Sequence, residues 1–135
     1  MLAKSDEEIL NDRLQNWGRW AADRPHAGQN VLWRFMKLYG EAPAEEEPQE
    51  HPPVLDEFDA VFVNRAWQGL PESPLRYKTA KWILAAHYCY PNLHTRWVCK
   101  QLHVGRKDYE TLLTLAKYLI FNRLTYEASK RLASD

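Results

Sequence analysis

Two cations, Arg106 and Lys107, begin a polar stripe on a segment whose other face is apolar. The stripe continues with polar residues at helical spacing: Glu110, Thr111, Thr114 and Lys117. Arginine and lysine bind guanine edges and phosphates, and glutamate and threonine also contact bases in the major groove. This combination is typical of a helix that binds double-stranded DNA. An ordinary helical hairpin with a solvated basic face is the alternative.

The apolar residues around these cations fit a helix-turn-helix over about residues 93–127. With the small position of the motif placed on Cys99, its other structural positions become Val98, Leu102, His103, Val104, Tyr109 and Leu112. Cys99 has to be small because the two helices cross closely there. His103 occupies a turn position that glycine usually holds, so we expect a positive φ at some cost. The recognition helix should run from Arg106 to about Ala128.

Other apolar-periodic segments must position this motif, and all of them have helical spacing. Helices are expected from about Asp6 to Ala22, within residues 31–40, from Asp56 to near Gly69, and from Ser73-Pro74 to about Tyr88. No run alternates with period two over a strand's length. The sequence therefore predicts an all-α fold.

Capping signals support three of these helix starts. Ser5 and Glu8 form a capping box before the first helix. Asp56 is an N-cap candidate, with Phe58 on the apolar face that follows it. Ser73 is a second N-cap candidate, and Pro74 would then occupy the first helical position.

A proline-rich acidic stretch, "EAPAEEEPQEHPP", covers residues 41–53 and predicts an irregular linker. It would separate an N-terminal helical segment, residues 1–40, from a helical domain, residues 54–135. The net charge of zero hides an asymmetry, because residues 1–58 hold six Lys or Arg and twelve Asp or Glu. Residues 59–135 hold twelve Lys or Arg and six Asp or Glu. Two different partner surfaces are one interpretation, and two solvated faces are the other.

The composition favours a cytoplasmic protein. A 135-residue chain with 45% hydrophobic residues can bury a core without disulfides, and two cysteines are too few for a secreted scaffold. No uninterrupted apolar run is long enough to span a membrane, and the N-terminus has no signal-peptide pattern.

Catalysis is the weakest class of function for this sequence. It has no phosphate-cradling glycine loop, no nucleophile–histidine order and no distinctive carboxylate pair. A zinc site is conceivable from five residues: His87, Cys89, His94, Cys99 and His103. However, Cys99 is needed as a buried small residue and His103 as the turn, so we expect neither a metal nor another cofactor.

The segment "RLQNWGRWAAD", from Arg13 to Asp23, resembles the "R-L-x-x-W-G-x-W-A" opening of the phage late-gene antitermination protein Q family, in its short, phage-21-like branch. The order of features is also similar: the tryptophan helix, a variable middle, the Tyr-rich segment "ILAAHYCYPNL", and a helix-turn-helix similar to sigma factor region four. The similarity spans roughly Arg13 to Arg123. His103 and the proline-rich insert depart from the family pattern.

The resemblance implies a transcription factor of the bacterial host cytoplasm. It would bind DNA near a late promoter and load onto paused host RNA polymerase, possibly beside the sigma factor, making the polymerase resistant to terminators. Self-association on DNA is a further expectation. By position, the resemblance makes five residues DNA-facing: Arg106, Lys107, Glu110, Thr111 and Thr114. A simple transcriptional activator, or a polymerase adaptor that does not read DNA, are the alternatives.

Four residues are candidates for contact with a partner protein: Arg19, Trp20, Tyr118 and Phe121. Trp17 follows the apolar stripe of its helix and is expected in the core. Tyr118 and Phe121 lie off the apolar stripe of the recognition helix. Either the N-terminal half covers them, with the first helix as a lid, or they form an exposed partner surface.

Overall fold

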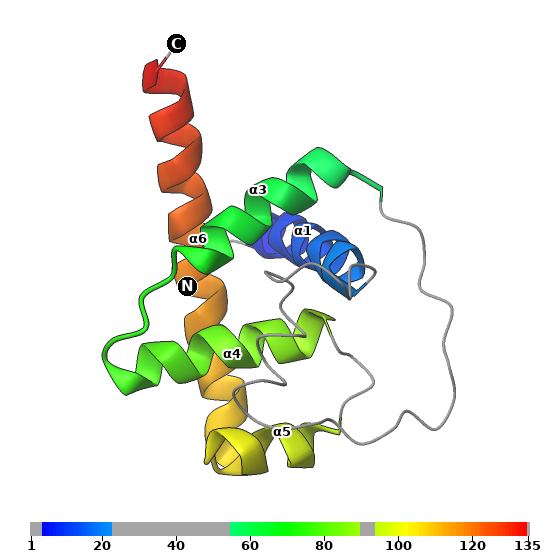
Figure 1. Cartoon of the computed structure of the whole chain (residues 1–135), viewed down its shortest axis with the longest axis vertical. Coiled ribbons are helices and arrows are strands. Elements are labelled where there is room, and N and C mark those ends of the chain that lie inside the picture. Colours follow the sequence, from blue (N-terminus) through cyan, green and yellow to red (C-terminus); the bar gives the residue numbers. More distant parts are fainter. Residues whose placement is uncertain (1–3, 23–54, 90–93, 135) are drawn as a thin grey trace.

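The computed structural model describes residues 4–22, 55–89 and 94–134 of the chain. Within these ranges there are five helices and no strand: α1 (Lys4–Ala22), α3 (Glu57–Gln68), α4 (Leu75–Cys89), α5 (Thr95–Leu102) and α6 (Arg106–Ser134) (Figure 1). The all-α prediction is therefore confirmed for the described residues. The helix expected within residues 31–40 and the linker at 41–53 lie outside them. None of the helices in the described ranges combines the length and the apolar character that a membrane span requires.

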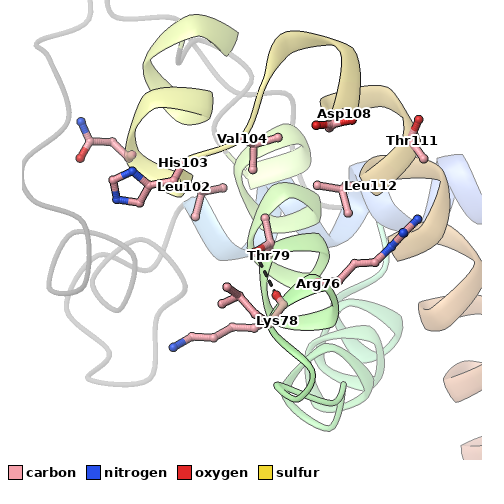
Figure 2. Close-up of a pocket in the computed structure, with 11 residues that line it drawn as sticks. Arg76, Lys78, Thr79, Leu102, His103, Val104, Asp108, Thr111 and Leu112 are labelled. Atoms are coloured by element: carbon pink, nitrogen blue, oxygen red, sulfur yellow. Dashed lines mark hydrogen bonds between the residues drawn. The ribbon is translucent and has the colours of Figure 1, made fainter.

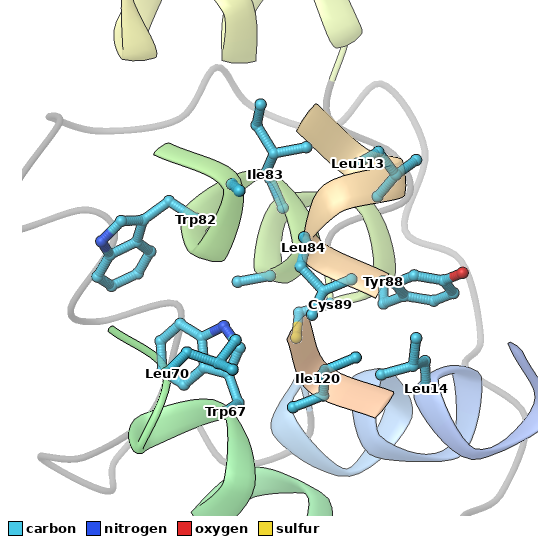
Figure 3. Packing of buried hydrophobic residues seen from close by; sticks show 14 of the residues in the cluster. Leu14, Trp67, Leu70, Trp82, Ile83, Leu84, Tyr88, Cys89, Leu113 and Ile120 are labelled. Atoms are coloured by element: carbon cyan, nitrogen blue, oxygen red, sulfur yellow. The ribbon is translucent and has the colours of Figure 1, made fainter. Parts of the chain in front are cut away.

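The central helix is α4, which packs against α1, α5 and α6 (Figure 1). All of residues 80–86 are buried, so this helix has no solvated side over two turns. A helix that is buried all round belongs to the middle of a core. Leu113 and Ile120 of α6 lie in the same buried cluster as Ile83 and Leu84 of α4 (Figure 3). This crossing fixes the position of α6.

Three fully buried tryptophans join α1, α3 and α4. The ring centroids of Trp17 and Trp67 are 5.9 Å apart, and those of Trp67 and Trp82 are 5.2 Å apart in an edge-to-face arrangement. Trp17 donates its indole N–H to Asn64 Oδ1 at 3.1 Å, and Trp67 donates to the carbonyl of Lys81 at 3.0 Å. The expectation that Trp17 belongs to the core is confirmed, and α1 shares one core with the later helices.

A buried lysine, Lys81, is only 2% exposed in the middle of α4. Its ammonium donates to the carbonyls of Gln68 and Leu70 at 3.2 and 3.5 Å, and it forms an ion pair with Glu72 at 3.4 Å. It also lies 4.9 Å from the centroid of a Trp67 ring. Lys81 thus satisfies carbonyls at the C-terminal end of α3, where a cation is favoured by the helix dipole.

Of the three predicted helix starts, one is confirmed and two are wrong. The Asp56 cap is confirmed, because its carboxylate accepts a hydrogen bond from the backbone N–H of Asp59 at 3.0 Å. The Ser5 capping box is wrong, since α1 begins at Lys4 and Ser5 is itself helical. Pro74 is not the first helical residue either; α4 begins at Leu75.

Two further expectations need correction. Phe58 was expected on the apolar face of α3, but it is 92% exposed, because the buried side of α3 runs through Ala60, Val63 and Trp67 and Phe58 lies on the opposite side of the helix. The recognition helix was expected to end near Ala128, yet α6 continues to Ser134. Its C-terminal end extends beyond the other helices (Figure 1).

Candidate nucleic-acid interface

A three-residue turn of His103, Val104 and Gly105 joins α5 to α6. His103 has φ 57° and ψ 47°, in the left-handed region, which confirms the expected positive φ. The backbone N–H of Val104 donates to the carbonyl of Cys99 at 2.9 Å, and that of His103 to the carbonyl of Lys100 at 3.4 Å. These two bonds satisfy carbonyls at the end of α5 and fix the direction in which α6 leaves.

The apolar positions around the turn are buried as the sequence predicts. Five of them are at most 9% exposed: Val98, Cys99, Leu102, Tyr109 and Leu112. Val104 is partly buried and packs against the same cluster. Burial also raises the pKa of the Cys99 thiol, although Arg106 acts in the opposite direction. The thiol therefore remains protonated at neutral pH and serves as a small packing residue.

The polar stripe on α6 faces solvent. Its exposed members are Arg106, Lys107, Glu110, Thr111 and Thr114, while Lys117 is partly buried. The Thr114 hydroxyl donates to the carbonyl of Glu110 at 2.9 Å, so that hydroxyl is already engaged with the backbone. Neither Arg106 nor Lys107 forms an ion pair with a described residue. Both cations are therefore free to bind an anion.

A histidine–tyrosine contact lies beside one edge of this stripe. His87 Nδ1 is 3.3 Å from the hydroxyl of Tyr109, which is a buried residue of α6. Partial burial lowers the pKa of His87, with nearby Lys117 as a second cause and Glu110 acting against them. The imidazole therefore stays neutral at neutral pH, and the contact fixes the first turns of α6 against the end of α4.

A groove of about 710 Å³ lies on the other side of the stripe, between the first turns of α4 and the turn (Figure 2). Leu75, Arg76 and Lys78 line it from α4, while His103 and Thr111 line it from the opposite walls. Among the described residues that line it, the only acidic one is Asp108, in the first turn of α6. The groove connects the cations of α4 with the outer face of α6.

The two aromatic candidates on α6 differ in exposure. Tyr118 is 49% exposed, whereas Phe121 is partly buried and packs against the core. The first helix packs against α3 and α4 and leaves Tyr118 in solvent, so it is not a lid over this residue. Of the two residues, Tyr118 is the better candidate for a partner contact.

The tryptophan motif on α1 has mainly structural roles. A Cβ atom at Gly18 would overlap the backbone carbonyl of Tyr88, so only glycine allows α1 to approach the end of α4 this closely. Trp17 is fully buried, and Trp20 is partly buried against the core. Arg19 is partly exposed. A partner contact by Arg19 or Trp20 stays a prediction.

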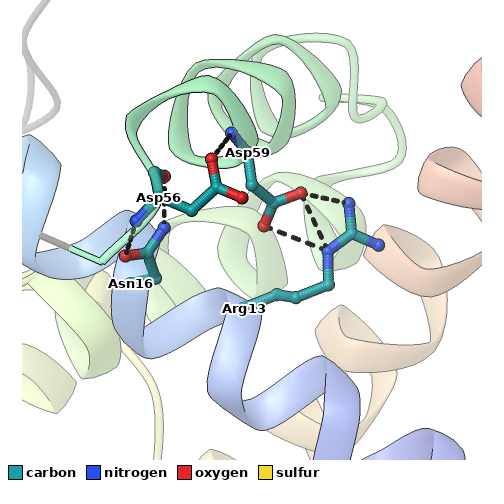
Figure 4. Close-up of polar contacts among 4 residues, drawn as sticks. All are labelled: Arg13, Asn16, Asp56 and Asp59. Carbon is teal, nitrogen blue, oxygen red and sulfur yellow. Dashed lines mark hydrogen bonds and ion pairs between the residues drawn. The ribbon is translucent and has the colours of Figure 1, made fainter.

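Two polar residues of the same motif hold the start of α3 (Figure 4). Asn16, only 6% exposed, donates to the carbonyl of Asp56 at 2.7 Å and accepts from the backbone N–H of Leu55 at 2.9 Å. The Arg13 guanidinium forms an ion pair with Asp59 at 2.8 Å. Neither role could be predicted from the sequence, where the one local signal is a pair of polar residues, Arg13 and Asn16, beside the apolar stripe of Leu14 and Trp17.

No three His, Cys, Asp or Glu side chains of the described residues lie close enough to hold a metal ion. Cys89 and Cys99 are free and buried, and burial raises the pKa of the Cys89 thiol well above its ordinary value. His94 and His103 are exposed at the two ends of α5. The five residues considered for zinc thus differ in their surroundings, because the two cysteines are buried whereas His94 and His103 are exposed.

Comparisons with models of protein families, with curated proteins and with solved structures found no match to this chain. The resemblance to the antitermination family therefore stays a prediction. What the chain can do follows from its own residues and their placement.

Proposed function

We propose that this protein is a transcription factor that binds double-stranded DNA through a helix-turn-helix made of α5, the turn at His103, and α6. The observation that carries the proposal is the placement of Arg106 and Lys107. Both are exposed, unpaired with any described residue, and located in the first turn of a helix that follows a left-handed turn residue. The N-terminal turns of such a helix can enter the major groove.

Because α6 is long, its first, middle and last turns can have different roles. At about 1.5 Å per residue, its 29 residues extend over roughly 44 Å, far more than a major groove about 12 Å wide can accommodate. The first turns carry the polar stripe. The middle turns pack against α4 through residues such as Ala116 and Ile120. The last turns are exposed, which leaves them available for another partner.

We further propose the activity that the resemblance implies, which is antitermination. The protein would bind near a late promoter, load onto paused host RNA polymerase and allow it to read through terminators. Tyr118 supports a polymerase contact because it is a large aromatic residue left in solvent next to the core. It lies beyond the residues that would enter the DNA groove.

Transcription by purified host polymerase, on a template with the cognate late promoter and a downstream terminator, tests this function. Antitermination predicts that adding the protein increases the read-through product without changing initiation. An increase in initiation alone would instead identify a simple activator. Read-through on a template that lacks the protein's DNA site would identify an adaptor that does not read DNA.

A further inference from the structure

We propose that Arg76 and Lys78 of α4 form a second DNA-contact site, which binds the phosphate backbone beside the recognition helix. This inference rests on the proposed DNA binding by α6 and extends it to a helix outside the helix-turn-helix. The site lies along the groove between the start of α4 and the turn (Figure 2).

The groove places the cations of α4 opposite the outer face of α6. Figure 2 shows Arg76 extending from α4 toward the α6 side, where Thr111 lies, and Lys78 extending toward the His103 side. Thr111 belongs to the face that would enter the major groove. A helix in that groove has one DNA strand along each flank, so the strand on this flank would pass Arg76.

The charges near the turn favour an anionic partner. Residues 75–79 and 94–117 contain seven Lys or Arg and only two Asp or Glu. Neither Arg76 nor Lys78 forms an ion pair with a described residue. Elsewhere in the molecule, Arg13 and Arg123 are paired with carboxylates at 2.8 Å. The unpaired cations Arg76 and Lys78 therefore lie in a part of the molecule where positive charge prevails.

The chemistry of the groove favours phosphate contacts over base reading. Its inner wall is apolar, with Leu102, Val104 and Leu112, so an anion in the groove would be bound mainly by the cations at its rim. Lysine and arginine at the rim bind phosphates irrespective of sequence. Asp108 also lines the groove and would repel a phosphate, so the strand should lie nearer to Arg76 than to the first turn of α6.

The test is DNA binding by the Arg76→Ala/Lys78→Ala variant of the full chain, measured by fluorescence anisotropy over a series of salt concentrations. The probes are a random-sequence duplex and a duplex selected by the wild-type protein from a randomised pool. Both duplexes should lose affinity several-fold and by the same factor. The slope of log K against log [salt] should become shallower by about 0.9 for each phosphate that the variant no longer binds.

A charge-matched control removes two exposed cations near the far end of α6, one from α3 and one from α6. Arg65 and Lys130 line a small pocket there together with Glu127. The Arg65→Ala/Lys130→Ala variant should retain the wild-type affinity and salt slope. If it weakened binding as much as the test variant, net charge rather than a defined site would explain the loss, and the inference would fail.

Other outcomes separate this inference from the proposed function. If Arg106→Ala/Lys107→Ala weakens binding and Arg76→Ala/Lys78→Ala does not, only the α4 site is wrong. A loss confined to the selected duplex would also overturn it, because phosphate contacts carry no sequence preference. Normal DNA affinity combined with weaker polymerase binding would assign the groove to a protein partner instead. A wild-type protein that binds neither duplex would end both proposals.

Discussion

Gly18 of α1 lies directly against the backbone carbonyl of Tyr88, at the point where α1 meets the end of α4. Because the obstacle is backbone, a neighbouring side chain cannot make room for a methyl group. Gly18→Ala should therefore destabilise the fold by about 1–3 kcal/mol, as overpacking typically does. Urea denaturation measures this change. Gln15→Ala, at an exposed position of the same helix, should stay within about 0.5 kcal/mol of wild type. Equal free energies of unfolding for the two variants would contradict the close approach of α1 to the end of α4.

The left-handed residue His103 permits a second stability test. His103→Gly removes the Cβ atom that makes φ 57° costly, but it also makes the unfolded chain more flexible. We expect the free energy of unfolding to be unchanged or to rise by up to about 1 kcal/mol. His103→Val should cost about 1–2 kcal/mol, because a β-branched residue is an outlier at positive φ. The reverse order of the two denaturation midpoints would show that residue 103 is not left-handed in solution.

Much of the turn could be predicted from sequence because its determinants are local. The spacing of Cys99, His103 and Leu112 indicates a helix end, a turn and a buried face within one short stretch of the chain, residues 99–112. The contacts of Gly18 with Tyr88 and of Asn16 with Asp56 could not be predicted. They join helices far apart in the chain, and they depend on crossing angles that no local pattern specifies. The burial of Lys81 could not be predicted either. The carbonyl that its ammonium binds belongs to the end of α3, which lies beside α4 only in the folded protein.

Alkaline pH should weaken the fold through two buried phenols. Burial raises the pKa of Tyr88 and that of Tyr109 to about 12, from an ordinary value of 10. The folded state thus favours the neutral phenol, and the stability that this provides is fully present below pH 10 and is lost as pH rises towards 12. The denaturation midpoint should be constant from neutral pH to about pH 10 and then fall.

The Tyr88→Phe variant, which also loses the hydrogen bond to Asn11 at 2.9 Å, should show a shallower fall because one titrating group is absent. Phenolate absorbance followed during the titration identifies the ionisation itself. Ionisation of all tyrosines near pH 10, with no change in stability, would mean that these two phenols are not buried in solution.

Phe121 and Tyr118 should respond differently to truncation, since only Phe121 packs against the core. Phe121→Ala should destabilise the protein by roughly 1–3 kcal/mol, less than the 3–5 kcal/mol typical of a fully buried phenylalanine. Tyr118→Ala should leave stability and DNA binding unchanged and reduce terminator read-through. Full read-through by a folded Tyr118→Ala protein would remove this residue from the partner surface.

The central claim is that the first turn of α6 reads DNA, and the binding of Arg106→Ala/Lys107→Ala tests it most directly. Gel-shift titrations with the selected duplex and a random duplex give both affinities for wild type and variant. Both side chains are exposed, so the variant should fold normally, and unchanged thermal unfolding verifies this. We predict that affinity for the selected duplex falls by roughly 1–3 kcal/mol for each base edge that the variant no longer binds, with a smaller loss on random DNA. Unchanged affinity of the folded variant for both duplexes would contradict the claim.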